Sequence, residues 1–259
     1  MSNALKCFSL ARKTVLIAGA SGGVGAHLAR IAGCAGARVV LAAPRVGPLK
    51  EVAKDIEFEN GQAFCVAMDV TDRASVEKAF DSAEDAFGVI DVVLNNVGIG
   101  VGPRPLTVIE EDCQAMLSSN YEGIWRVAQC AAQRLVKAGR SGSIINIAST
   151  LGLHVSNQFS HYSTAAAGVV QLSKSLALEL AHYQIRVNAI ALGNFQTNVT
   201  DGNLGDGKGQ AYIHNNVPMR RQGNLAELQG PFLLLASDAG SFMTGAVLAV
   251  DGGLLVSSL

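Results

Sequence analysis

The sequence predicts a single α/β domain built on a parallel sheet of about seven strands with helices on both faces. Apolar runs without polar alternation, as buried parallel strands require, recur along the chain and alternate with stretches of helical periodicity. The 259 residues are 49% hydrophobic, which is enough for one large core. No linker-like segment interrupts the pattern, so we expect one doubly wound domain over residues 1–259.

The individual elements follow from local composition. Val, Ile, Leu and Ala gather in runs at residues 14–18, 38–42, 63–68, 89–95, 143–148, 186–191 and 246–250, which we expect to be strands. Helical periodicity predicts helices at residues 24–36, 48–59, 74–87, 110–138, 161–182 and 225–237. Glycines make residues 193–216 the least regular part. They favour a flexible lid over a pocket, although an ordinary surface loop has the same composition.

Charge and cysteine content exclude several classes of protein. A net charge of −1 with scattered basic residues predicts no nucleic-acid or anionic-membrane partner. No apolar run approaches the roughly 20 residues of a membrane span, and residues 1–13 are too polar for a signal peptide, so we expect a cytoplasmic protein. The five cysteines show no Cys-x-x-Cys pair, which indicates reduced thiols and no metal site.

A glycine-rich turn follows the first expected strand. Gly19, Gly23 and Gly25 surround Ser21 just before the first expected helix. Glycines at such a place allow a tight turn, close approach of the backbone to a pyrophosphate, and a helix N-terminus directed at its charge. The turn alone is weak support for a nucleotide, because a plain tight turn has the same composition. Its position after an N-terminal buried strand strengthens that interpretation.

Ser149 and Tyr162 are the residues most suggestive of chemistry. Ser149 follows an apolar strand, and Tyr162 begins a helix. A ketone and its secondary alcohol differ by a hydride and a proton, so their interconversion needs a hydride carrier and an acid/base at the oxygen. A tyrosine has a pKa near 10 and needs a nearby positive charge to act as a base at neutral pH. The position one helical turn later holds Ala166, which supplies none.

These motifs together resemble the classical short-chain dehydrogenase/reductase family, and in bulk its 3-oxoacyl reductase-like members. The resemblance extends from Thr14 to the Val250-Asp251-Gly252-Gly253 segment, and the family signature Tyr-x-x-x-Lys ends here on Ala166. It implies a Rossmann-like fold and hydride transfer between a nicotinamide cofactor and a small-molecule carbonyl or alcohol, by default a hydrophobic one. It also implies a homotetramer. The apolar residues Val169, Val170, Leu172, Leu176 and Leu180 suit such contacts, although burial within one subunit gives the same pattern.

The resemblance assigns a set of cofactor-binding residues along the chain. The glycine turn would bind the pyrophosphate, the end of the third strand the adenine, and the segment after residue 192 the nicotinamide carboxamide. The implied residues are Gly19, Ser21, Gly23, Gly25, Arg45, Asp69, Val70, Asn95, Gly98, Tyr162 and Thr197. A different interpretation of Asp69, as the N-cap of the next helix, remains open.

Cofactor choice depends on the end of the second strand. A ribose with free hydroxyls favours an acidic residue there, whereas a 2′-phosphate favours arginine. The segment ends on Pro44 and Arg45 and contains no carboxylate. We therefore favour NADP(H), with NAD(H) possible.

Within the resemblance, each candidate catalytic residue has a role. Asn120 would bend its helix around a water that connects to the missing lysine. Ser149 would hold the substrate oxygen, and Tyr162 would transfer the proton. Apart from the resemblance, His154 is a nearby imidazole that we expect to line the substrate pocket, although a surface position stays open. Lys174 cannot replace the missing amine, because it lies two turns beyond Ala166, about 12 Å along the helix.

Two explanations of Ala166 stay open. The chain is either a reductase altered by substitution, which the otherwise intact motif favours, or a protein that naturally lacks the lysine. In the second case it is a weak reductase, a nucleotide-binding regulatory protein or a catalyst of a non-redox reaction on the same fold. Either way, the sequence predicts impaired proton transfer in this chain.

Overall fold

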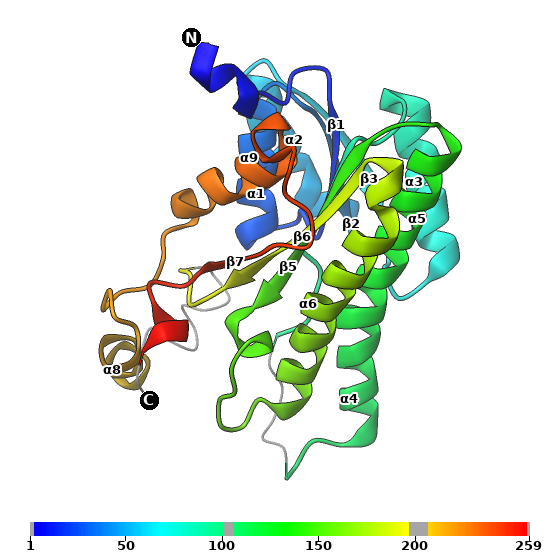
Figure 1. The fold of residues 1–259 in the computed structure, drawn as a ribbon. Helices are drawn as coiled ribbons and strands as arrows, with labels where there is room; N and C mark the ends of the chain where they lie inside the picture. The colour runs from blue at the N-terminus through cyan, green and yellow to red at the C-terminus, as the bar shows by residue number, and fades with distance from the viewer. Residues whose placement is uncertain (1–2, 101–105, 197–206, 258–259) are drawn as a thin grey trace.

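The computed structural model describes residues 3–100, 106–196 and 207–257, which form a seven-stranded sheet with helices on both faces (Figure 1). The strands are β1 Thr14–Ala18, β2 Arg38–Ala43, β3 Gln62–Ala67, β4 Val92–Asn95, β5 Gly142–Ser149, β6 Ile185–Leu192 and β7 Val247–Val250. All neighbouring strands are parallel, in the order β3-β2-β1-β4-β5-β6-β7. The predicted Rossmann-like fold is confirmed.

The helices divide between the two faces of the sheet. They are α1 Gly23–Cys34, α2 Val46–Phe58, α3 Arg73–Phe87, α4 Glu110–Leu117, α5 Ile124–Lys137, α6 Ser160–Leu180, α8 Gly207–Asn216 and α9 Gln229–Ala236. In Figure 1, α1, α2 and α9 cover one face and α3, α5 and α6 the other. Short 3₁₀ helices include η1 Asn3–Phe8, η3 Thr150–Gly152 and η5 Leu225–Leu228.

Strand geometry explains why the core has two layers. Successive side chains of a strand point to opposite faces, so the continuous apolar runs predicted from the sequence supply both layers. Ile17 of β1 packs in the layer under α1, α2 and α9, where Phe232 is fully buried. Leu16 packs in the opposite layer with Phe80 of α3, which is also fully buried.

Two expected elements differ from the structure. The single helix expected at residues 110–138 is wrong, because a π-helical turn, η2 Ser118–Gly123, separates α4 from α5. The wider turn accommodates close packing of Gly123 on Val70: a Cβ on Gly123 would lie 2.6 Å from Val70 Cγ2. Within the segment expected to be least regular, α8 is helical, while residues 197–206 lie outside the described part of the chain.

A chain of buried hydrogen bonds fixes α6 against the sheet. The Asn95 side-chain amide at the end of β4 donates to Oδ1 of the Asn146 side chain on β5 at 2.8 Å. Asn146 donates to the Ser173 hydroxyl on α6 at 2.9 Å, and Ser173 donates to the Val169 carbonyl one turn earlier at 2.8 Å. These three polar side chains are fully buried. Because buried amides need partners, the Asn146–Ser173 bond helps to hold α6 in place on β5 and β6, the strands against which it packs.

The described residues contain no candidate membrane span and no candidate metal-binding cluster. None of their helices is long and apolar enough to cross a bilayer. Within the same residues no group of three His, Cys, Asp or Glu side chains is placed to hold a metal ion. The five cysteines are free thiols.

Candidate active site

The glycine turn lies where the strand order reverses, between β1 and β4, at the carboxyl edge of the sheet. Gly19 has φ +78°, and a Cβ there would lie 2.0 Å from the Asn96 carbonyl oxygen. A Cβ on Gly25 would lie 2.1 Å from the Gly19 carbonyl oxygen. Ser21 and Gly23 are exposed at the start of α1. This cradle, which side chains would fill, fits the pyrophosphate of a dinucleotide at a helix N-terminus.

Arg45 follows β2 and occupies the N-cap position of α2. Its side chain is exposed, and Pro48 sits in the first turn of α2, where proline is tolerated. Asp69, after β3, is exposed, and its carboxylate accepts hydrogen bonds from the Thr71 amide at 2.9 Å and hydroxyl at 2.7 Å. These bonds lower the pKa of Asp69. The N-cap of α3 is Asp72 and not Asp69.

The two asparagines at the end of β4 point to different surroundings. Asn95 is fully buried in the network with Asn146. It does not line the main cavity of the structure, which Ser149 and Tyr162 line. Asn96 lines the cavity, and its amide donates to the Gly19 carbonyl at 3.2 Å. Gly98 also lines the cavity. Asn96 is thus a site residue that the sequence analysis missed. The available signal was strand alternation, because neighbouring side chains point to opposite faces and only one of the two asparagines can face the cavity.

Asn120 lies in the π-helical turn and connects it to the segment after β4. Its side-chain oxygen accepts a hydrogen bond from the Ile99 amide at 2.8 Å, and its nitrogen donates to the Ile99 carbonyl at 3.1 Å. The buried carboxamide also contacts Gly98, where a Cβ would lie 3.3 Å away. Asn120 therefore shapes the wall of the cavity by holding both elements together.

Ser149, Tyr162 and Ala166 line one cavity of about 780 Å³ together with Asn120. Ser149 ends β5, and Tyr162 and Ala166 are one turn apart on α6. Burial raises the pKa of the Tyr162 hydroxyl, and its hydrogen bond with Ser149 partly opposes that shift. None of the described residues that line this cavity is charged, so nothing among them replaces the amine that Ala166 lacks.

One predicted substrate-binding residue does not line the cavity, and one predicted cofactor-binding residue is not described. His154 is outside the cavity lining, and its Nδ1 lies 2.8 Å from the carbonyl oxygen of Val155. Thr197 falls outside the described residues. The lining instead includes Phe159 and Tyr212, which sequence reasoning did not single out because isolated aromatic residues carry no motif.

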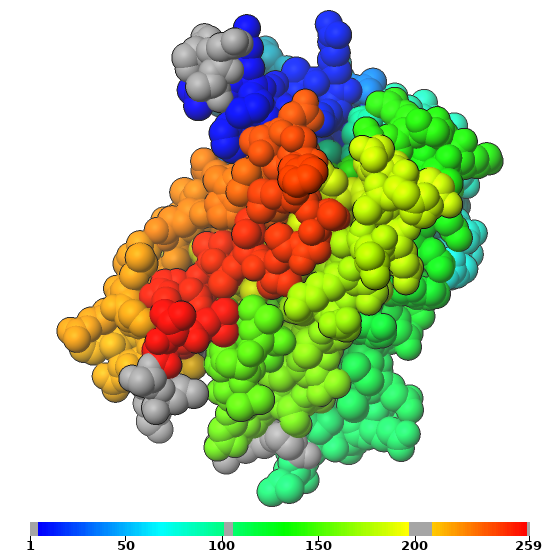
Figure 2. All heavy atoms as spheres, viewed as in Figure 1, coloured from blue at the N-terminus to red at the C-terminus, as the bar shows by residue number. Residues whose placement is uncertain are grey.

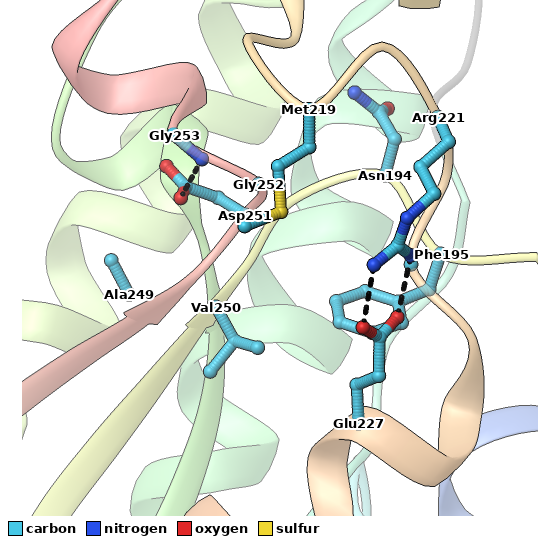
Figure 3. Close-up of a pocket in the computed structure, with 11 residues that line it drawn as sticks. Asn194, Phe195, Met219, Arg221, Glu227, Ala249, Val250, Asp251, Gly252 and Gly253 are labelled. Carbon is cyan, nitrogen blue, oxygen red and sulfur yellow. Dashed lines mark hydrogen bonds and ion pairs between the residues drawn. The ribbon is translucent and has the colours of Figure 1, made fainter.

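A second cavity of about 330 Å³ lies next to the first and shares Asn194 and Phe195 with it. Figure 3 shows Arg221 and Glu227 paired beside the Phe195 ring, with Asp251 on the opposite side. Hydrogen bonds from Arg221 and from the Asn224 amide hold the pKa of Glu227 at about 2. Asp251 accepts hydrogen bonds from the Gly253 and Leu255 amides, both at 2.8 Å. The charged groups here are therefore satisfied by the protein itself.

Comparison with known proteins places the chain among dinucleotide-dependent α/β enzymes. A family model described as enoyl-(acyl carrier protein) reductase matches residues 19–255. The L-rhamnose 1-dehydrogenase (NAD(P)(+)) of Azotobacter vinelandii is 36% identical over 250 residues, covering 95% of this chain and 97% of that protein. The 3-oxoacyl-[acyl-carrier-protein] reductase FabG of Thermotoga maritima is 32% identical over 244 residues, covering 94% of this chain and 98% of that protein.

Solved structures of related enzymes have the same fold as this chain. A gluconate 5-dehydrogenase from Burkholderia cenocepacia in complex with NADP and tartrate superposes with a TM-score of 0.94 at 32% identity, covering 99% of this chain and 100% of the other. The chain belongs to the short-chain dehydrogenase/reductase family of oxidoreductases, which act on alcohol and ketone groups. The description of the family model names one reaction within the family and does not define the reaction of this chain.

The raised pKa of Tyr162 leads to an expected pH dependence. Alcohol oxidation needs the phenolate, whose fraction grows about tenfold per pH unit until the pKa is reached. Because that pKa lies above its ordinary value, we expect kcat/KM for oxidation to rise without a plateau from pH 7 to pH 10, measured as nucleotide reduction with a secondary alcohol. Ketone reduction uses the protonated tyrosine and should stay level over the same range. A plateau of the oxidation rate below pH 8 would contradict this assignment.

Proposed function

We propose that the chain is an NAD(P)(H)-dependent oxidoreductase that interconverts a ketone and a secondary alcohol, acting chiefly as a reductase, with activity impaired by Ala166. The observation that carries the proposal is the Ser149–Tyr162 hydroxyl pair in a cavity beside the glycine turn. A substrate carbonyl within reach of both hydroxyls would be oriented by Ser149 and protonated by Tyr162. The nicotinamide cofactor, when bound, supplies the hydride to the carbonyl carbon.

NADP(H) is the favoured cofactor, and NAD(H) remains compatible with the site. The exposed Arg45 stands at the end of β2, in a segment without a carboxylate that would engage a ribose with free hydroxyls. The solved relatives support this choice, because the gluconate 5-dehydrogenase carries NADP. Gly19, Ser21, Gly23 and Gly25 would hold the pyrophosphate.

Ala166 impairs the reaction through the charge it fails to supply. After Tyr162 gives up its proton, its phenolate remains largely buried beside a cavity whose described lining residues carry no positive charge. A buried unpaired anion is costly, so the transition state in which that charge develops is destabilised. The chain's own residues still bind and orient a carbonyl, and the protonated Tyr162 still donates.

Restoring the amine should restore the rate. We expect Ala166→Lys to raise ketone reduction by roughly 10² to 10⁴-fold, the usual contribution of positioned acid/base groups. The measurement is NADPH and NADH oxidation with a panel of hydrophobic ketones, 3-oxoacyl esters and sugar lactones. Ala167→Lys is the matched control: it adds the same side chain at the next, exposed position of α6 and should leave the rate unchanged.

Two outcomes would argue against the reductase. Equal rates for both lysine variants would show that the charge at position 166 does not matter. Nucleotide binding without hydride transfer, even in Ala166→Lys, would favour a nucleotide-binding regulatory protein or a non-redox reaction.

We also propose that the protein is a cytoplasmic homotetramer. The apolar run along α6 does not carry this proposal, because Val169 and Val170 are buried within the subunit. Support comes from the exposed side chains of Leu178, on α6, and Phe242, shortly before β7, and from β7 itself, which is only half-buried. Figure 2 shows α6 and the β7 segment side by side on one open face. Free cysteines suit a reducing compartment.

The oligomer can be tested by light scattering. We expect a tetrameric mass in solution, and a lower mass for Leu178→Glu because a charge cannot be buried at an apolar interface. Phe58→Glu is the control, because Phe58 is equally exposed but lies on α2. A monomeric mass for the unaltered chain would contradict the proposal.

A further inference from the structure

Arg221 and Glu227 form a two-bond ion pair at the edge of the second cavity (Figure 3). Arg221 Nη1 donates to Glu227 Oε2 at 2.8 Å, and Nη2 donates to Oε1 at 2.7 Å. Such parallel bonds fix the orientation of both side chains more strictly than a single contact does. Arg221 also donates to the Gln222 carbonyl at 3.1 Å, which ties the pair to the backbone leading into Gly223.

Glu227 also closes the backbone around Asn224. Its carboxylate accepts a hydrogen bond from the Asn224 amide at 2.8 Å, while the Asn224 side chain accepts one from the Ala226 amide at 2.9 Å. This reciprocal arrangement is a capping box at the start of η5. The Glu227 carboxylate therefore bonds both to the Arg221 side chain and to the Asn224 backbone, and these bonds close the segment from residue 221 to residue 227 into a loop.

The segment held in this way bonds directly to the wall of the main cavity. Gly223 donates to the Asn194 carbonyl at 2.8 Å and accepts from the Gln196 amide at 3.0 Å, forming a parallel bridge around Phe195. The Phe195 ring packs so closely on Gly223 that a Cβ there would lie 2.5 Å from it. Phe195 is buried and lines both cavities.

We propose that Arg221 and Glu227 are a positioning pair for nucleotide binding, holding the Gly223 backbone and through it the Asn194–Phe195 wall of the main cavity. The inference rests on the proposed function, because this wall follows β6 at the carboxyl edge of the sheet, where the nicotinamide end of a dinucleotide would lie. An exposed ion pair contributes little to global stability. Its effect should therefore be local order of the wall.

The test compares nucleotide affinity in variants that alter only this pair. Glu227→Gln keeps the size of the side chain but removes the charge, and we expect the Kd for NADPH to rise roughly 5- to 30-fold, measured by titration calorimetry. The amides of Gln196 and Gly223 should exchange hydrogen faster in the nucleotide-free chain, because their bridge is loosened. In the Ala166→Lys background, KM for the nucleotide should rise with kcat nearly unchanged.

Two further variants separate positioning from general damage. The charge-swapped chain, Arg221→Glu with Glu227→Arg, should recover part of the lost affinity. Asp238→Asn is the matched control, because it removes the charge from another surface ion pair, in which Lys13 Nζ and Asp238 Oδ1 are 2.8 Å apart. Lys13 directly precedes β1, so this pair lies at the opposite edge of the sheet from the cavity. This control should leave the Kd unchanged.

The outcomes also distinguish this inference from the proposed function. If the unaltered chain binds NADPH and Glu227→Gln binds it equally well, the positioning role is wrong while the oxidoreductase proposal stands. If the unaltered chain binds neither NADPH nor NADH, the proposed function fails and this inference fails with it. A loss of affinity in the Asp238→Asn control as large as in Glu227→Gln would also overturn the positioning role.

Discussion

The buried hydrogen-bond chain from Asn95 through Asn146 to Ser173 is the constraint on which the site depends. It joins the end of β4 and the interior of β5 to α6, which carries Tyr162 and Ala166. The Asn146–Ser173 bond is the one in this chain that crosses from the sheet to α6. A buried amide or hydroxyl left without a partner costs about 1–3 kcal/mol, so a slide or rotation of α6 that breaks this bond is unfavourable. These hydrogen bonds lie away from the reacting atoms, yet they help to set the distance between Ser149 at the end of β5 and Tyr162 on α6.

Within this frame the site has well-placed polar groups and a missing charge. Because β1, β4 and β5 are parallel, Ser149 at the end of β5 lies at the same edge of the sheet as the glycine turn. Tyr162, in the first turn of α6, forms a hydrogen bond with Ser149 there. Asn120 and the π-helical turn hold the segment after β4 against the cavity. Ala166 faces the same space. The fold is that of the short-chain dehydrogenase/reductase family, and under the proposed function the deficit is a single electrostatic contribution, the amine absent at position 166.

Most of the fold could be predicted because buried parallel strands leave continuous apolar runs in the sequence. All seven strands lie within a few residues of the expected ranges, and Pro48 and Gly88 mark helix boundaries where backbone sterics demand them. The family resemblance implied a bend of this helix at Asn120, but not its form, which is a π-helical turn. In that turn Gly123 packs on Val70, a contact between residues far apart in sequence that the sequence does not reveal. Helix α8 was missed because its glycines favour loops when tertiary contacts are unknown.

The candidate site was predictable where a motif constrains the backbone, as at Gly19 and Gly25, whose lack of a Cβ the structure requires. It was not predicted where the role of a residue depends on the direction of its side chain. Asn95 and Asn96 are neighbours of the same type, yet Asn95 is buried in the sheet and Asn96 lines the cavity. The Arg221–Glu227 pair escaped notice because surface charges six residues apart carry no signal until the turn between them is known.

The central claim is that the absent positive charge beside Tyr162 limits the reaction, and small amines test it most directly. Methylammonium is a cation at neutral pH and fits a cavity of this size, so adding it should raise ketone reduction by this chain saturably, by roughly tenfold or more. Ethanol, similar in size but uncharged, should have no effect, and Ala166→Lys should not respond to the amine. An equal response of both proteins to methylammonium, or no response of this chain, would contradict the account.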